Sequence, residues 1–132
     1  MKYENDKYYH VYNRGANRQN IFLKNENYEY CINLLLKYSP QYHVSIFAYC
    51  LMPNHYHLLL RQNGNGSIGR FIQTVFNSYT QAFNKITFHS GTLFQGRAKS
   101  ILVDSDEYGI QVCRYIQIIW NGLANEMDCS LI

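Results

Sequence analysis

The chain has 132 residues, 47% of them hydrophobic, with 13 tyrosines, 7 phenylalanines and a formal net charge of +3. This length suits one domain, residues 1–132, with a substantial core, and the composition excludes a disordered or fibrous chain. The small positive charge permits nucleic-acid binding without requiring it. No apolar run is long enough to span a membrane, and the N-terminus lacks the hydrophobic stretch of a signal peptide. We therefore expect a cytoplasmic protein with no membrane partner.

The first half of the chain alternates between strand and helix patterns. Residues 8–13 are rich in β-forming side chains and end at a polar loop signal. Apolar residues then recur at helical spacing from residue 25 and stop before Pro40. Residues 44–51 and 56–61 predict two strands, which a proline–asparagine turn joins into a hairpin.

The second half continues with a long helix and one more strand. Apolar residues from 68 to 88 fall on one face of a helix. Residues 98–103 predict a strand, and the polar run 104–107 suits the start of a last helix that ends near Asn121. The order β-α-β-β-α-β with a terminal helix predicts an α+β, ferredoxin-like (split βαβ) fold, with helices on one face of an antiparallel sheet.

Four cysteines, Cys31, Cys50, Cys113 and Cys129, lack CxxC or any other zinc spacing. In the reducing compartment expected for this protein, disulfides are rare. We therefore expect buried or free thiols without a chemical role.

Two histidines, His55 and His57, stand at positions i and i+2 where the strand 56–61 begins. Side chains alternate along a strand, so both histidines point to one face and Tyr56 points to the other, into the core. The preceding turn cannot continue a central strand, which places the pair at the open mouth of the sheet. By itself the pattern is a weak signal for a metal site, because two structural histidines that donate to backbone carbonyls would have the same spacing.

Tyr79 lies on the apolar stripe of the long helix, together with Val75, Phe83 and Ile86. The periodicity alone favours a tyrosine that packs in the core. A phenol is also a competent nucleophile toward a phosphodiester when a divalent ion neutralises the phosphate oxygens. Both interpretations of Tyr79 are compatible with its spacing.

Three motifs together resemble one known family: residues 9–15 (YHVYNRG), 48–59 (AYCLMPNHYHLL) and 91–100 (GTLFQGRAKS). In this order they resemble the one-tyrosine, His-hydrophobe-His (HUH) transposases of single-stranded insertion sequences, most closely the branch associated with repetitive extragenic palindromes. The resemblance covers nearly the whole chain. It implies one catalytic domain with a ferredoxin-like fold, which cuts and rejoins hairpin-flanked single-stranded DNA through a 5′-phosphotyrosine with bound Mg²⁺ or Mn²⁺.

The resemblance also assigns roles to single residues. His55 and His57 match the metal-binding histidines, and Tyr79 matches the nucleophile. The third metal ligand of the family is an amide about one helical turn beyond the tyrosine. Because position 83 is a phenylalanine, Asn84 is the expected third ligand and Gln81 is the alternative.

Basic residues are candidates for contacts with the DNA backbone, namely Arg14, Arg18, Arg61, Arg97 and Lys99. This assignment rests on charge, because phosphate contacts position a strand without reading its sequence. Ordinary solvation of surface residues explains many such side chains equally well.

Two departures from the family pattern motivate an alternative function. One is the phenylalanine at position 83, and the other is the stretch 115–121 (YIQIIWN), where the family often has an Asn-Pro. A catalytically inactive module that binds hairpin DNA or RNA on the same fold would tolerate both. Members of the family often form dimers in which the tyrosine of one subunit serves the histidines of the other, so we also expect a homodimer.

Overall fold

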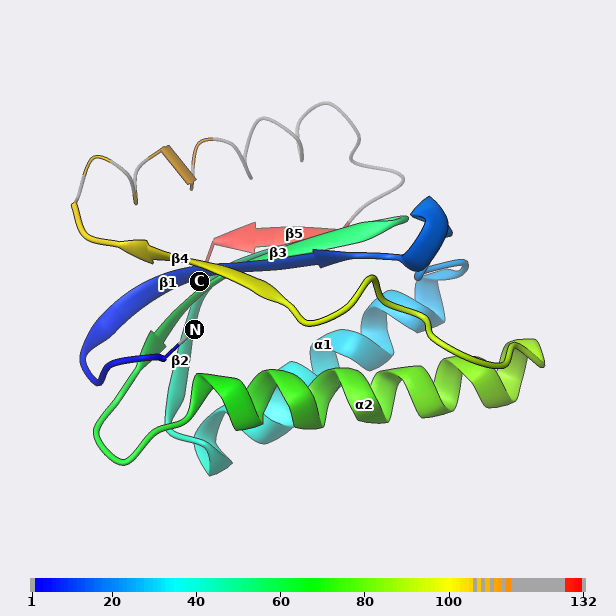
Figure 1. The fold of residues 1–132 in the computed structure, drawn as a ribbon, viewed down its shortest axis with the longest axis horizontal. Coiled ribbons are helices and arrows are strands. Elements are labelled where there is room, and N and C mark those ends of the chain that lie inside the picture. The colour runs from blue at the N-terminus through cyan, green and yellow to red at the C-terminus, as the bar shows by residue number, and fades with distance from the viewer. Residues whose placement is uncertain are drawn as a thin grey trace.

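This computed structural model of the chain describes residues 2–105, 107, 109, 111, 112 and 114, and the backbone of 128–131. The elements are β1 (Lys7–Arg14), a short 3₁₀ helix η1 (Ala16–Arg18), α1 (Asn25–Gln41), β2 (Val44–Met52), β3 (His55–Gln62), α2 (Ile68–Thr87), β4 (Lys99–Val103) and β5 (Asp128–Leu131). Helices α1 and α2 lie side by side on one face of the sheet (Figure 1).

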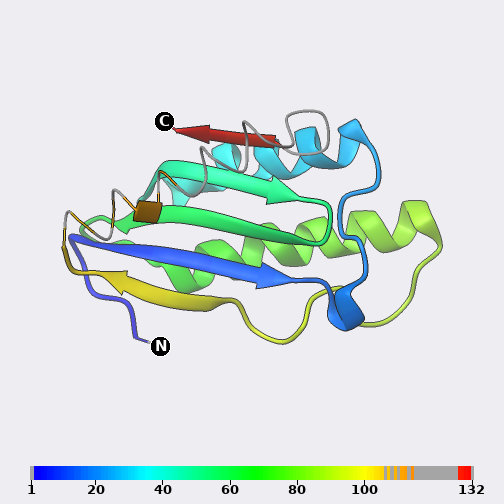
Figure 2. The same ribbon diagram turned by 90° about the horizontal axis from the view of Figure 1, so that it is seen from above.

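The sheet has the strand order β4-β1-β3-β2-β5, and every neighbouring pair is antiparallel. Figure 2 shows this order from above. The crossover that places β1 next to β3, and β4 outside β1, is the split βαβ arrangement. The predicted α+β, ferredoxin-like fold is therefore confirmed.

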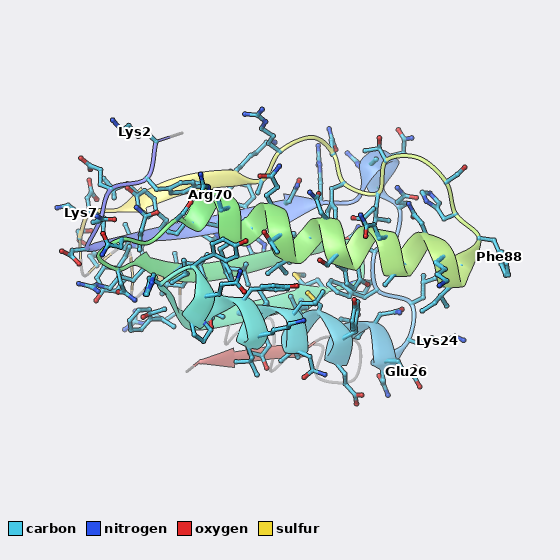
Figure 3. All side chains as sticks on the ribbon, turned by 90° about the horizontal axis from the view of Figure 1, so that it is seen from below. Lys2, Lys7, Lys24, Glu26, Arg70 and Phe88 are labelled. Carbon is cyan, nitrogen blue, oxygen red and sulfur yellow. The ribbon has the colours of Figure 1, made fainter. Side chains whose placement is uncertain are left out.

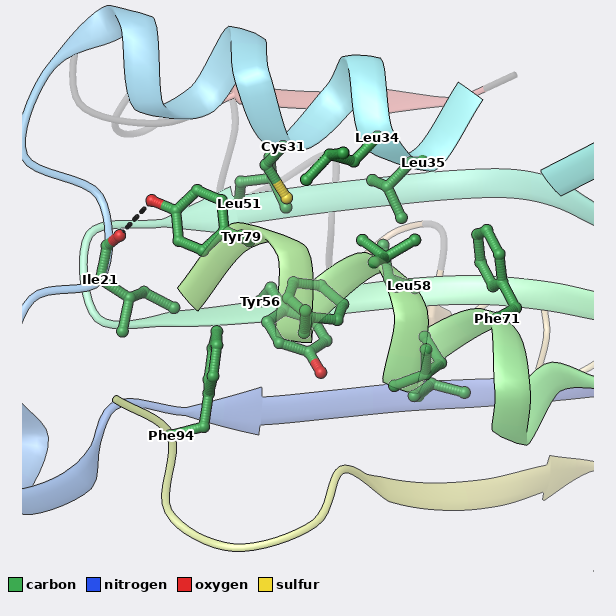
Figure 4. Packing of buried hydrophobic residues seen from close by; sticks show 14 of the residues in the cluster. Ile21, Cys31, Leu34, Leu35, Leu51, Tyr56, Leu58, Phe71, Tyr79 and Phe94 are labelled. Atoms are coloured by element: carbon green, nitrogen blue, oxygen red, sulfur yellow. Dashed lines mark hydrogen bonds between the residues drawn. The ribbon is translucent and has the colours of Figure 1, made fainter. Parts of the chain in front are cut away.

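The main core lies between the helices and the sheet. Alternate residues of β3, among them Tyr56 and Leu58, point toward the helices, where α2 contributes an apolar face that includes Phe71, Val75 and Phe76 (Figure 4). The ring of Tyr56 stacks on Phe76 with 4.2 Å between centroids. Burial of large aromatic and aliphatic side chains is the main stabilising contribution, at about 1.5–3 kcal/mol for each fully buried one.

A second, smaller cluster lies on the opposite face of the sheet. Ala48 and Cys50 of β2 and Leu59 of β3 are buried there, together with Val112. Val112 comes after β4 in the chain, in a stretch whose described residues between 107 and 114 are helical. Val112 therefore covers part of the face that the two main helices leave open.

Helix α1 continues through Pro40 to Gln41, whereas the sequence predicts an end before this proline. Pro40 lacks the backbone N–H that would bond to the carbonyl of Leu36, and its ring crowds that carbonyl, so the last turn has one bond fewer. The carbonyl oxygen of Pro40 still accepts a bond from the N–H of His43 at 3.2 Å. The left-handed φ of 51° at His43 then ends the helix.

Helix α2 begins at the predicted position and is capped by Ser67, whose hydroxyl accepts a bond from the N–H of Arg70 at 3.1 Å. It ends at Thr87, after which Phe88 has a left-handed φ of 57° and is 95% exposed. Figure 3, a view from the helical side, shows Phe88 projecting from this end. No helix among the described residues is both long and apolar enough to cross a membrane.

The cysteines and the C-terminal part of the chain differ in part from the predictions. Cys31 is a buried thiol, as predicted, whereas Cys50 is disulfide-bonded and not a thiol. Strand β5 is not among the strands predicted from the sequence, and it pairs with β2, with Cys129 opposite Cys50. The predicted helix from 104 to about Asn121 and the side chains of Cys113 and Cys129 lie largely outside the described residues.

Candidate nucleic-acid and metal site

The register of three strands gathers polar side chains on the face opposite the helices. Lys99 of β4 pairs with Tyr12 of β1, which in turn pairs with His57 of β3. Arg14 of β1 pairs with His55 in the next row on the same face. Residues directly opposite each other in an antiparallel pair point the same way, so these five side chains share one face. The prediction that the two histidines share a face is confirmed.

These side chains line a pocket of about 410 Å³ at the end of the sheet where β3 begins. Its lining includes three basic side chains, Arg14, Arg18 and Lys99. The rest of the lining consists of the two histidines, Tyr12 and the amide side chains Asn13, Asn54 and Gln95. Among the described lining residues, three are basic and none is acidic. A pocket with this charge attracts phosphate groups.

The three sequence motifs meet at this pocket. Arg14, from the first motif, donates from Nε to Oε1 of Gln95, from the third motif, at 2.8 Å, and its carbonyl oxygen accepts the N–H of Gln95 at 2.9 Å. Asn13 donates to the carbonyl oxygen of Gly96 at 3.1 Å. The loop before β4 is thus tied to the end of β1, beside the histidines of the second motif.

Each histidine of the pair has a side-chain hydrogen-bond partner at Nδ1. His55 donates from Nδ1 to Oδ1 of Asn54 at 2.7 Å, and Nδ1 of His57 lies 2.9 Å from Nε2 of His10. The His55 and His57 rings are nearly perpendicular, with centroids 5.2 Å apart. A neutral His55 that donates from Nδ1 carries its lone pair on Nε2, which is the form that binds a metal.

Burial keeps the histidines of this site neutral. It lowers the pKa of His10 and of His55 below the ordinary value of 6.5. For His57, burial and then the nearby His10 and His55 lower the pKa to about 3. Neutral imidazoles are the metal-binding form. In the described part of the chain, no group of three or more His, Cys, Asp or Glu side chains is arranged to hold a metal ion, so the two imidazoles would need oxygen ligands to complete a shell.

These pKa values predict that the metal-free protein loses stability in acid. The unfolded chain protonates His57 near pH 6.5, whereas the folded protein protonates it near pH 3. Between these values the unfolded state binds more protons, so the free energy of unfolding falls as the pH falls. Above pH 6.5 both states are neutral and His57 adds no pH dependence.

Thermal unfolding in EDTA from about pH 7 to about pH 5 measures this effect. The matched variant His57→Gln should show a shallower decline in Tm than the wild type. An equal decline in both proteins would contradict the assignment to His57.

The structure does not bring Tyr79 to the histidine pair. This residue lies on α2, on the helical side of the sheet, and is 1% exposed. Its hydroxyl donates to the backbone carbonyl of Ile21 (Figure 4). Its ring packs against Phe22. Burial also raises the pKa of the phenol, which disfavours the phenolate. The apolar stripe predicts a residue that faces the sheet, but the sheet itself separates Tyr79 from His55 and His57.

Asn84, the expected third metal ligand, also lies away from the pair. Its Oδ1 accepts a bond from Nδ1 of His89 at 2.8 Å, and its Nδ2 donates to the carbonyl oxygen of Gly91 at 3.3 Å. Gln81, the alternative ligand, is exposed on the same helix. Because α2 as a whole packs on the other face of the sheet, neither amide lines the histidine pocket.

The five basic candidates divide into two groups. Arg14, Arg18 and Lys99 line the pocket, as described. Arg61 lies near the far end of β3, where it forms an ion pair with Asp6 at 3.0 Å. Arg97 is exposed in the loop before β4 and is not among the lining residues.

Sequence reasoning missed His10, Tyr12, Asn54 and Gln95 as site residues. The signal for His10 and Tyr12 is their alternate spacing in one predicted strand, which places both on one face. Which strand lies beside that face depends on the sheet register, and the sequence does not contain this information in any local pattern.

The chain matches the IS200-like transposase family over residues 4–118. No curated protein sequence matches it. Among solved structures, a REP-associated tyrosine transposase bound to a REP hairpin superimposes with a TM-score of 0.70 at 15% identity, over 92% of this chain and 71% of that one. A putative transposase from Deinococcus radiodurans R1 gives a TM-score of 0.61 at 19% identity, over 89% and 93%.

At these identities the solved structures establish a shared fold. The family match establishes more than a shared fold, because it spans most of the chain and includes the histidine pair and all three motifs. The chain therefore belongs to the IS200-like transposase family.

Proposed function

We propose that this chain is a DNA transposase that cuts and rejoins single-stranded DNA at hairpin-flanked sites through a 5′-phosphotyrosine, with a divalent metal at His55 and His57. The observation that carries the proposal is the pocket itself, where a neutral histidine pair lies beside three basic side chains in a chain of the transposase family. Phosphate binding, metal binding and strand cleavage need these groups together.

The residues of the pocket fit a divalent ion in their donor chemistry. Two neutral imidazoles suit Mn²⁺ or Mg²⁺ in a shell completed by oxygen atoms of water and phosphate. When bound, such an ion neutralises charge on the scissile phosphate. His55 and His57 would hold it.

The chemistry of strand transfer needs no external energy source. The tyrosine oxygen attacks phosphorus, the bond to the 3′-oxygen breaks, and the 3′-hydroxyl leaves with a proton. Later a 3′-hydroxyl attacks the phosphotyrosine, so that a phosphodiester forms again and the tyrosine regains its proton. Arg14, Arg18 and Lys99 hold the strand by its phosphates during both steps.

The nucleophile that we propose is Tyr115 rather than Tyr79. Support comes from the described residues on either side of it in the chain. β4 ends at Val103, which pairs with Tyr8 at the end of the sheet away from the pocket. Val112 then packs in the middle of the histidine-bearing face, beside Cys50 and Leu59.

The next described position after Arg114 is Asp128, which pairs with Leu51 at the pocket end of β2. In the sequence, Tyr115 directly follows Arg114 and comes three positions after Val112. Tyr115 itself lies outside the described residues. Among the described residues that line the pocket, Tyr12 is the tyrosine.

The proposed phosphate contacts predict that variants of the basic residues change the salt dependence of DNA binding. Arg18→Gln and Lys99→Gln should each reduce the slope of log Kobs against log salt concentration by about 0.7–0.9 for a hairpin oligonucleotide, because each removes one phosphate contact. Arg61→Gln is the matched control, since Arg61 pairs with Asp6 away from the pocket. Fluorescence anisotropy at several salt concentrations measures the slopes, and a reduction confined to Arg61→Gln would contradict these contacts.

Hairpin DNA is the proposed partner because the similar REP-associated transposase is bound to a REP hairpin.

A homodimer is proposed as well, since a second subunit is one way to bring a tyrosine to this pocket. We expect light scattering with hairpin DNA to show protein of twice 15.6 kDa. Mixing Tyr115→Phe with His57→Ala should then restore cleavage, and a monomer under all conditions would exclude the dimer. The expected cytoplasmic location stays a prediction.

The burial of Tyr79 favours one alternative, a catalytically inactive module that binds hairpin DNA or RNA. This module would use the same basic pocket without a covalent step. Incubation with a labelled hairpin oligonucleotide and Mn²⁺, followed by denaturing electrophoresis, separates the two functions. A transposase gives a denaturation-resistant adduct, whereas a binding module gives a tight complex that denaturation dissolves.

A further inference from the structure

His10 contacts the histidine pair from outside the pocket. It lies on β1, is partly buried, and is not among the residues that line the pocket. Its Nε2 lies 2.9 Å from Nδ1 of His57, with ring centroids 5.1 Å apart and an interplanar angle of 29°. The neighbouring ring of Tyr12 lies 5.1 Å from His10 and 5.9 Å from His57.

A hydrogen bond between two neutral imidazole nitrogens contains one proton, so only two arrangements exist. If His10 donates from Nε2, then His57 carries its own proton on Nε2. If His57 donates from Nδ1, its Nε2 carries a lone pair that points away from His10. Only the second arrangement lets His57 bind a metal through Nε2.

We propose that His10 is a positioning residue that accepts the Nδ1 proton of His57, holds its ring and presents Nε2 to a divalent ion. The inference rests on the metal site of the proposed function. The neighbouring ligand has the same arrangement, since Nδ1 of His55 donates to Oδ1 of Asn54 at 2.7 Å. Each proposed ligand therefore has an acceptor behind it, which is how proteins usually fix the tautomer and orientation of a metal-binding histidine.

Three variants test this role. In His10→Gln the amide oxygen takes the place of Nε2 and still accepts the proton, whereas in His10→Phe an aromatic ring stays and the acceptor is lost. The control is His89→Phe, because His89 bonds to Asn84 at the end of α2, away from the pocket. Thermal melts establish that each variant is folded.

Titration calorimetry with Mn²⁺ alone measures affinity without any need for activity. We expect His10→Phe to weaken Mn²⁺ binding by about 10–100-fold, whereas His10→Gln and His89→Phe stay close to wild type. Long-range proton–nitrogen NMR spectra of the metal-free protein report the tautomer of His57. They should show the Nδ1-protonated form in wild type and in His10→Gln, and its loss in His10→Phe.

Two results would overturn the role of His10 alone. In one, wild type binds Mn²⁺ and His10→Phe binds it equally well with an unchanged tautomer. In the other, His10→Gln loses as much affinity as His10→Phe, which would indicate packing and not an acceptor. If wild-type protein binds no Mn²⁺, the metal site of the proposed function fails, and the role of His10 fails with it.

Discussion

Tyr115→Phe is expected to abolish covalent attachment to single-stranded hairpin DNA while hairpin binding stays close to wild type. The substitution removes one oxygen and keeps the ring, so it removes the nucleophile without removing the surface around it. Loss of a nucleophile removes the covalent route altogether, and we expect the adduct to fall by at least about a thousand-fold. Denaturing electrophoresis of a labelled oligonucleotide after incubation with Mn²⁺ measures the adduct, and anisotropy measures binding.

Tyr79→Phe and Tyr12→Phe are the matched controls. Tyr79→Phe removes the donor to the carbonyl of Ile21, so it should lower the free energy of unfolding by about 1–3 kcal/mol and leave the adduct intact. Tyr12→Phe tests the tyrosine in the described wall of the pocket. Loss of the adduct in folded Tyr79→Phe, with the adduct retained in Tyr115→Phe, would return the nucleophile to Tyr79, as the family resemblance implies.

The double substitution His55→Ala, His57→Ala is expected to abolish metal-dependent cleavage and the stabilisation that Mn²⁺ gives to the folded protein. A ligand that binds only the folded state stabilises it by about 2.7 kcal/mol at one hundred times its Kd, so wild type should melt at a higher temperature as Mn²⁺ rises. The variant lacks both imidazoles and should not respond.

The same variant should also be moderately less stable in EDTA. His57 is partly buried and bonds to His10, so its removal leaves a small cavity and takes away one partner of His10. We expect a loss of about 1–3 kcal/mol, within the range of a lost buried hydrogen bond. His89→Ala is the control and should respond to Mn²⁺ like wild type. A double variant that still gains stability from Mn²⁺ would move the metal site elsewhere in the chain.

Local patterns account for most of the fold. Strand alternation in 56–61 placed Tyr56 in the core and both histidines on the other face, as the structure shows. Helical periodicity in 68–88 located α2 within a residue at each end. The predicted helix end before Pro40 is wrong, because the helix loses one backbone bond at this proline and still continues to Gln41.

Periodicity alone favoured a core position for Tyr79, which the structure confirms, and it was the family resemblance that assigned this residue as the nucleophile. The apolar stripe of α2 shows that Tyr79 faces the sheet. A helix has the same stripe whether it packs on the face of the sheet that bears the histidines or on the opposite face. The path of the chain between the strands decides on which face of the sheet the helix packs. In this chain α2 packs against Tyr56 and Phe94, on the side away from His57.

By itself, the sequence determined the class of fold, the shared face of His55 and His57, and the family, because these follow from alternation, periodicity and three ordered motifs. Only the tertiary structure decided which other groups join the pair. The register of β4 on β1 and of β1 on β3 brought Lys99 and Tyr12 beside His57 from positions far apart in the chain. Register depends on contacts between strands that are distant in sequence, so no local pattern of residues carries it.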